Sequence, residues 1–200
     1  MSHVIRELVE AVILALLVFF IIQVSIQNFR VEGHSMRPNL EGGEYLMVNK
    51  IAFLKLDKYR LARLVPFWDV PKHEETYLPF THPPERGDVI VFHAPVQPPR
   101  DFVKRVIGLP GETVELRSGA TYINGARLEE PYLQGGGFSS SANPLTLGGN
   151  EYYVMGDNRS SSHDSRDWGP APLDTIVGKV WFVYWPLSEL PFVGKLADYR

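Results

Sequence analysis

The chain has 200 residues, of which 44% are hydrophobic and 12% aromatic, as is typical of a folded protein with one core or a core and a small lobe. A formal net charge of −3 gives no basic surface of the kind that binds nucleic acid. The chain has no cysteines, which excludes a disulfide scaffold, a thiol nucleophile and a cysteine-ligated zinc site.

The N-terminal part of the chain holds its longest apolar run. Residues 11–22 read AVILALLVFFII, and further apolar residues follow to Ile26. A helix of this length is slightly short of the roughly 30 Å hydrocarbon core of a bilayer unless Leu8 and Val9 extend it. A cleaved signal peptide would need a small-x-small cleavage pattern, and a buried core helix would need helical partners; the sequence offers neither. We therefore predict an uncleaved membrane anchor over residues 1–28.

The rest of the chain has the pattern of a β protein. Short alternating or aliphatic runs are separated by Gly and Pro turns, and no long segment repeats with the 3.6-residue period of a helix. Asn124-Gly125 joins two such runs and predicts a tight hairpin, because both turn residues must adopt positive φ. The main predicted strands are EYLMVNKI (44–51), DVIVFHA (88–94), DFVKRVIGL (101–109), TVEL (113–116), EYYVMG (151–156) and VGKVWFVYW (177–185).

The predicted fold class is mainly β, with an N-terminal transmembrane helix followed by an antiparallel β-sheet domain over residues 29–200. A Pro-rich and aromatic segment, residues 53–85, is predicted to be an insertion. Residues 117–150 are predicted to form a small β-ribbon lobe.

Ser35 lies in the stretch VEGHSMRPNL, directly after the predicted anchor. Such a serine is most often a surface hydroxyl, and to act as a nucleophile it needs a histidine or an uncharged lysine to accept its proton. His34 is adjacent, but neighbouring side chains in an extended segment point to opposite faces. The same geometry argues against His163 and Asp164 acting as a relay. Neither histidine is excluded.

Lys104 is a more unusual candidate, because it is flanked by apolar residues in FVKRVIG. On an alternating strand, one of Lys104 and Arg105 should face inward, and burial would lower the pKa of a lysine. A free lysine is neutral in roughly one molecule in a few thousand at pH 7. A fall of about two pKa units raises that fraction about a hundredfold and costs about 2.7 kcal/mol. The alternative is a lysine whose stem packs on the sheet while its ammonium group reaches water.

Four blocks of the sequence, in this order and after an apolar anchor, resemble the bacterial type I signal peptidases of peptidase family S26. These are membrane-anchored serine proteases with a Ser/Lys dyad. The blocks are GHSMRPNL (33–40), RGDVIVF (86–92), FVKRVIGLPGE (102–112) and MGDNRSSSHDSRDWG (155–169). The resemblance implies a signal peptidase/LexA-like β-fold. It also implies that the protein removes signal peptides from exported preproteins, cutting after small residues at positions −1 and −3.

Carried over residue by residue, the resemblance implies that Ser35 is the nucleophile and Lys104 the general base. Ser162 would hydrogen-bond the lysine amine and hold it in a productive rotamer. Asp164 and Arg166 would form a paired brace that supports the lysine strand, although a plain surface ion pair is the alternative.

The chain departs from the family pattern at two positions of the first block. Gly33 stands where many relatives have a serine that helps to bind the oxyanion, so the Ser35 backbone N–H would need a second donor. Asn39 stands where threonine is usual. In the last block, Asp157 and Asn158 are predicted to shape a turn by Asx-type hydrogen bonds.

The resemblance also indicates a substrate pocket, in which an extended preprotein segment would add as a strand beside the residues leading into Ser35. For each pocket residue, ordinary core packing is the alternative. No metal or organic cofactor is implied. The residues that match the pocket lining are Phe29, Val31, Met36, Leu40, Leu46, Val91, Phe102 and Val103.

The implied partners are exported preproteins and the lipid bilayer, with the secretion translocon as a further candidate and no nucleic acid. The implied location is the inner or plasma membrane, with a single span and the catalytic domain on the extracytoplasmic side. Only the family resemblance indicates this topology. The positive charges of Arg6 and Arg30 lie on opposite sides of the anchor and nearly balance, so the distribution of basic residues gives little indication of its orientation. Aromatic residues such as Phe67, Trp68 and Phe192 either contact the lipid interface or pack on the insertion.

Three alternatives stay open at this point. A self-cleaving repressor protease would share a Ser/Lys site on a similar fold but would carry a DNA-binding helical domain in place of the anchor. A catalytically inactive, membrane-tethered β-domain would bind secreted segments without cutting them. A secreted domain would lose the anchor by cleavage.

Overall fold

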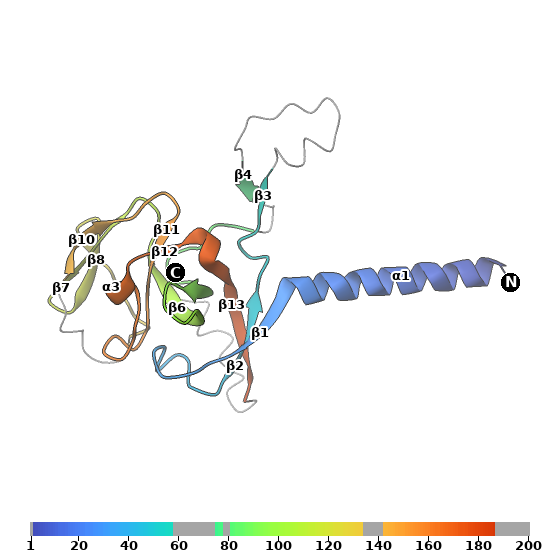
Figure 1. Cartoon of the computed structure of the whole chain (residues 1–200), viewed down its shortest axis with the longest axis horizontal. Helices are drawn as coiled ribbons and strands as arrows, with labels where there is room; N and C mark the ends of the chain where they lie inside the picture. Colours follow the sequence, from blue (N-terminus) through green and yellow to red (C-terminus); the bar gives the residue numbers. More distant parts are fainter. Residues whose placement is uncertain (1, 58–74, 78–80, 134–141, 187–200) are drawn as a thin grey trace, which may run out of the picture.

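A long helix, α1 (Ser2–Ser25), begins the chain and projects away from the β-structure (Figure 1). Its 24 residues span about 36 Å at 1.5 Å per residue, which is enough to cross the hydrocarbon core of a bilayer. Its apolar window is not buried against the rest of the protein, so α1 fits a membrane anchor. The computed structural model describes residues 2–57, 75–77, 81–133 and 142–186.

Strand β1 (Ile26–Arg30) starts directly where α1 ends. The Ser25 hydroxyl donates to the Ile21 carbonyl at 2.6 Å within the last helical turn. The chain then pairs in antiparallel fashion with β2 (Tyr45–Asn49). Residues 26–28, which the sequence assigned to the anchor, are therefore part of the sheet.

The main sheet has seven strands in the order β1-β2-β13-β5-β6-β11-β12, and its neighbouring strands are antiparallel. The predicted mainly antiparallel β fold with an N-terminal apolar helix is confirmed. The strands that complete the sheet are β13 (Ile176–Trp185), β5 (Val89–Ala94), β6 (Arg100–Gly108), β11 (Glu151–Met155) and β12 (Ala171–Pro172).

The centre of the sheet is covered on both faces, which explains the unbroken apolar run in β5. Val89 and Val91 pack into one core cluster, together with Met36 and residues of β2 and β13. The alternate residues Ile90 and Phe92 pack into a second cluster on the opposite face. Because side chains alternate along a strand, a strand that is buried on both faces needs apolar residues at every position.

A second sheet, in the order β10-β7-β8-β9, overlaps the predicted lobe at 117–150 and lies on the opposite side of the main sheet from α1 (Figure 1). Asn124 and Gly125 have φ values of 52° and 81°, which confirms the predicted hairpin turn between β8 and β9. Its strands are β7 (Thr113–Arg117), β8 (Ala120–Ile123), β9 (Ala126–Arg127) and β10 (Ala142–Thr146).

The remaining elements are short. Strands β3 (Lys55–Asp57) and β4 (Glu75–Tyr77) form a two-stranded ribbon within the predicted insertion. Most of that insertion lies outside the described residues, as do Phe67, Trp68 and Phe192. A helical turn, α3 (Ser165–Trp168), and a 3-10 turn, η1 (Leu173–Thr175), lead from the last sequence block into β13.

Candidate active site

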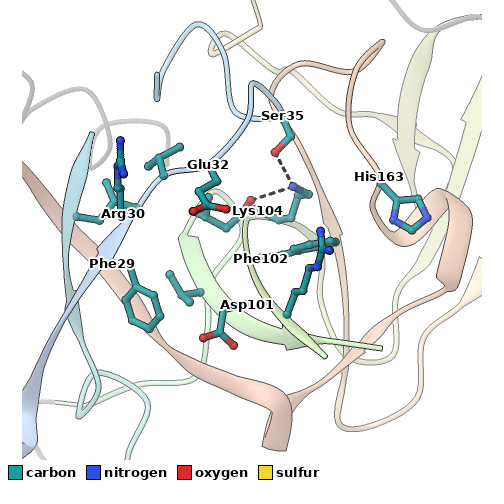
Figure 2. A pocket seen from close by; sticks show the side chains of 13 residues that line it. Phe29, Arg30, Glu32, Ser35, Asp101, Phe102, Lys104 and His163 are labelled. Atoms are coloured by element: carbon teal, nitrogen blue, oxygen red, sulfur yellow. Dashed lines mark hydrogen bonds between the residues drawn. The ribbon is translucent and has the colours of Figure 1, made fainter. Parts of the chain in front are cut away.

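Ser35 lies in the loop that joins β1 to β2, whereas Lys104 lies on β6. Three strands separate β1 from β6 in the order of the sheet, and the loop of Ser35 packs on the intervening strands through Met36 and Leu40. The cleft has a volume of about 580 Å³ (Figure 2). Its lining residues are Phe29, Arg30, Val31, Glu32, Ser35, Leu46, Val91, Arg100, Asp101, Phe102, Val103, Lys104 and His163.

The side chains of Ser35 and Lys104 meet in this cleft. Lys104 Nζ donates to Ser35 Oγ at 2.7 Å and to the Val103 carbonyl at 3.1 Å (Figure 2). The nitrogen also lies 5.1 Å from the centre of the Phe102 ring. Lys104 is only 3% exposed, so its amine is kept away from bulk water and within hydrogen-bonding distance of the hydroxyl.

Burial lowers the pKa of Lys104 from 10.5 to about 8, against the opposing influence of the Asp164 and Asp157 carboxylates and with a smaller lowering from Arg166. At pH 7 about one lysine in ten is then neutral, compared with about one in three thousand for a free lysine. The site therefore supplies an appreciable amount of uncharged amine next to a hydroxyl.

Lys104 and Arg105 are both buried, whereas the alternation of the strand predicted an inward position for one of them. The reason is that β6 is covered on both of its faces. Arg105 is 0% exposed and donates from Nε and Nη2 to the Asp157 carboxylate, at 2.8 and 2.6 Å. The unbroken apolar run in β5, which pairs with β6, was the sequence signal for this two-sided burial.

Asp157 and Asn158 hold other segments in place. The Asp157 carboxylate pairs with Arg105 instead of forming the predicted Asx turn. Asn158 holds the loop of the serine: its backbone N–H donates to the Ser35 carbonyl at 2.9 Å, and its side chain donates to the His34 carbonyl at 3.1 Å. These two residues therefore connect the last sequence block to both β6 and the Ser35 loop.

Asp164 and Arg166 pair with each other through two hydrogen bonds of 2.8 Å. Burial raises the pKa of Asp164, but the hydrogen bonds from Arg166 and from the Gly156 N–H outweigh it and hold this pKa below its usual range. Arg166 also donates to the carbonyls of Arg159 and Ser162. This pair braces its own loop, and the ion pair that reaches the lysine strand is Arg105–Asp157.

Ser162 does not form the hydrogen bond that the sequence led us to expect. Its hydroxyl is buried and has no hydrogen-bond partner among the described residues, although its proximity contributes to the lowered pKa of Asp164. It packs against Gly156, where a Cβ atom would collide with Ser162 Oγ and with the Ser35 carbonyl. Gly156, which sequence reasoning missed, is therefore a glycine because two parts of the site approach its Cα closely.

The two histidines considered as alternative bases lie elsewhere. His163 lines the cleft, but its ring packs edge-on against Phe102 at 6.4 Å between ring centres and is 58% exposed. His34 is exposed and contributes its backbone carbonyl to Asn158. Among the described residues, neither imidazole hydrogen-bonds Ser35, and Figure 2 shows the His163 ring well away from the Ser35–Lys104 pair.

Six of the eight predicted pocket residues line the cleft. Met36 and Leu40 do not, because the turn after Ser35 buries them in the core at 1% and 0% exposure. The charged lining residues Arg30, Glu32 and Arg100 were not predicted from the sequence. Within the described part of the chain, the Ser35 backbone N–H has no acceptor, and no group of three metal-ligating side chains occurs.

The fold and the site define a class of protein: a β-domain on an apolar N-terminal helix, with a hydroxyl and a desolvated amine paired in a cleft. The chain belongs to the signal peptidase family, peptidase S26, whose family model matches residues 5–185.

Two relatives that are similar in sequence over most of the chain also support this membership. Signal peptidase I of Bacillus caldolyticus is 35% identical over an alignment of 178 positions that covers 82% of this chain and 82% of the relative. Signal peptidase IB of Staphylococcus aureus (strain MRSA252) is 35% identical over an alignment of 208 positions that covers 94% of each chain. A crystal structure of a signal peptidase I from Enterococcus faecalis V583 is 34% identical, covers 50% of this chain and 97% of its own, and superposes with a TM-score of 0.45.

Proposed function

We propose that this protein is a type I signal peptidase, a serine endopeptidase that removes N-terminal signal peptides from exported preproteins after small residues at −1 and −3. The observation that carries the proposal is the 2.7 Å contact between Ser35 Oγ and an amine whose pKa is lowered to about 8. Membership of the signal peptidase family supports the same conclusion.

In the proposed mechanism, Ser35 is the nucleophile and Lys104 the general base. The neutral amine accepts the Ser35 proton as the oxygen attacks the scissile carbonyl, and it then passes that proton to the leaving amine. The same amine activates the water that hydrolyses the acyl-enzyme. The Ser35 N–H, which has no acceptor within the described part of the chain, is available for the oxyanion. Gly33 supplies no side-chain donor beside it, and removing a donor costs other serine proteases about 2.7–4 kcal/mol.

The substrate is proposed to bind as an extended strand along the cleft. Strand β1 is at the edge of the main sheet, so its outer backbone groups can pair with an added strand. Phe29, Leu46 and Val91 supply apolar walls for the side chains that precede the cut. Main-chain hydrogen bonds would bind the substrate with little dependence on its sequence. The apolar walls would select small residues at the positions that precede the cut.

The supporting residues are proposed to act through position. Asp164 and Arg166 hold the loop of Ser162, and Ser162 is proposed to hydrogen-bond the lysine amine after a rotation of its side chain. The Arg105–Asp157 pair holds the strand that carries Lys104.

We further propose that α1 crosses the inner or plasma membrane once and holds the catalytic domain on the extracytoplasmic side. Signal peptides leave the translocon embedded in lipid, so a site tethered at the bilayer searches for them locally. Trp181 and Trp185 on β13 are 57% and 51% exposed, and tryptophan favours the lipid–water interface. The bilayer is therefore a proposed partner, and the translocon is a further one.

A cleavage assay with the full chain in detergent tests the function. The substrate is a preprotein with alanine at −1 and −3, and a copy with tryptophan at −1 serves as the negative substrate. Wild type and a Lys50→Ala control, which removes an exposed lysine outside the cleft, should cleave the first substrate only. Lys104→Ala should lose cleavage. Binding without cleavage by the wild type would instead support the inactive, membrane-tethered alternative.

A further inference from the structure

We propose that Asn39 is a positioning residue that sets the distance between Ser35 and Lys104; this inference rests on the proposed function. Asn39 lies four residues after Ser35 in the same loop and is 7% exposed. Its side-chain nitrogen donates to Asp157 Oδ2 at 2.8 Å and to the Tyr132 carbonyl at 2.9 Å. The sequence marked this position only as a departure from the usual threonine.

The first of these bonds connects the serine loop to the lysine strand. Asp157 Oδ2 accepts from Asn39 and also from Arg105 Nη2, at 2.6 Å. Arg105 is the residue next to Lys104 on β6. One buried carboxylate oxygen therefore joins the loop of the proposed nucleophile to the strand of the proposed base.

The second bond extends the connection to the segment that follows β9. The Tyr132 carbonyl accepts from Asn39, and the Tyr132 ring lies 4.2 Å from the Arg105 guanidinium. Asn39, Asp157, Arg105 and Tyr132 thus form a closed ring of contacts, and all four residues are buried. Because each member touches two others, a displacement of one must move the rest.

The ring requires the particular chemistry of an amide at position 39. An asparagine side chain carries two N–H donors, whereas a threonine hydroxyl carries one. Asn39 uses its side-chain nitrogen for two contacts, with the Asp157 carboxylate and with the Tyr132 carbonyl. A threonine hydroxyl could donate to only one of these two acceptors, so one of the two contacts that hold the Ser35 loop would be lost.

The Ser35 loop is held at two points by consecutive residues of the last sequence block. Asn158 holds the Ser35 carbonyl, and Asp157 holds Asn39. Loss of the Asn39 contacts leaves the loop attached through Asn158 and through the core packing of Met36 and Leu40, but without its link to the strand of Lys104. A displacement of about 1 Å between reacting groups can lower a rate about a hundredfold, so the expected effect is on the chemical step.

The test compares Asn39→Ala and Asn39→Thr with wild type, as full chains in detergent, and measures kcat and KM on the alanine-containing preprotein together with the melting temperature. Thr81→Ala is the matched control, because it removes a buried hydroxyl that donates to the Leu54 carbonyl at 2.8 Å, away from the cleft. We expect Asn39→Ala to lower kcat roughly ten- to a hundredfold, with KM changed less than about threefold. Asn39→Thr should fall between Asn39→Ala and wild type, and Thr81→Ala should keep the wild-type kcat.

The inference is overturned if Asn39→Thr and any folded Asn39→Ala keep the wild-type kcat, or if their loss is in KM alone. It is also overturned if Thr81→Ala loses as much kcat for the same fall in melting temperature. If Asn39→Ala does not fold, Asn39→Thr alone decides. An inactive wild type would instead refute the proposed function. If the wild type is active, Lys104→Ala is inactive and the Asn39 variants are fully active, only the positioning role of Asn39 is refuted.

Discussion

Arg105 donates two hydrogen bonds to Asp157, and neither side chain of this ion pair is exposed to solvent. Lys104, the preceding residue, has no carboxylate within ion-pair distance among the described residues and contacts a hydroxyl and a carbonyl instead. Two adjacent basic residues thus have opposite surroundings: Arg105 is buried next to a carboxylate, whereas Lys104 is buried without one, which lowers its pKa.

The Arg105–Asp157 pair should be strongly coupled. Asp157→Ala leaves the buried guanidinium without its counterion, and we expect it to lower the free energy of unfolding by about 3–5 kcal/mol. The double variant Arg105→Met with Asp157→Leu should recover a large part of that loss, because it removes both buried charges. Urea unfolding of the two variants in one detergent measures the difference. Equal stability of the single variant and wild type would contradict the coupling.

The activity should follow the protonation of Lys104. Only the neutral amine can accept the Ser35 proton, and its pKa is lowered to about 8. We therefore expect kcat/KM to rise about tenfold per pH unit below pH 8 and to level off above it. Steady-state cleavage from pH 5.5 to 10 measures this profile. An acidic limb near pH 6.5 would assign the base to a histidine.

Lys104 should also destabilise the fold in a pH-dependent way. Its folded pKa of about 8 lies below the unfolded value of 10.5, so the folded state disfavours the protonated amine. The penalty of about 3 kcal/mol is complete below pH 8, shrinks as the pH rises from 8 to 10.5, and vanishes above that window. Lys104→Met should therefore be more stable than wild type at pH 7 and lose this advantage near pH 10.5. Thermal melts at the two pH values test the sign, and an advantage that is independent of pH would refute it.

Gly156 should not tolerate a side chain. In Gly156→Ala the new Cβ would collide with Ser162 Oγ and the Ser35 carbonyl, so the loop of the nucleophile must shift. We expect a loss of about 1–3 kcal/mol in stability and at least a tenfold fall in kcat. Gly149→Ala is the control, because no atom lies within 4 Å of a Cβ at that position. Similar activities for the two variants would show that the close approach at Gly156 has no role.

Trp181 and Trp185 should contact lipid when α1 is inserted. Reconstituted in vesicles that contain lipids brominated near the headgroup, the wild type should show quenched tryptophan fluorescence, since both indoles are exposed on β13. The quenched fraction should fall in the double variant Trp181→Phe with Trp185→Phe. Phe substitution at the half-buried Trp168, which packs on Phe92, serves as the control. An unchanged quenched fraction in the double variant would refute the lipid contact.

The elements that could be predicted from the sequence are those with a local signal. Aliphatic runs predicted the strands β2, β5 and β6, and Asn124-Gly125 predicted a hairpin turn. Both signals lie within a few consecutive residues, so they can be recognised without knowing the fold. Strand β1 was missed, since no turn residue separates it from the apolar run of α1.

The contacts between distant segments could not be predicted in this way. Asn39 bonds to Tyr132 and Asp157 across 93 and 118 residues of sequence, and nothing local distinguishes this asparagine from one in a surface turn. The burial of Arg105 depended on a strand pairing that only the assembled sheet defines. The expected Ser162 contact came from the family pattern, whereas in the folded chain its hydroxyl packs against Gly156.

Because β1 begins directly after α1, the distance between the end of the helix and the cleft is short. Phe29, in the wall of the cleft, is only four residues beyond Ser25, the last helical residue, and about 13 Å of extended chain spans that interval. With α1 in the bilayer as proposed, a connection of this length limits how far above the hydrocarbon core the cleft can lie. The choice of bond in a substrate would then depend on the spacing between its own hydrophobic core and the cut as well as on the residues beside that cut.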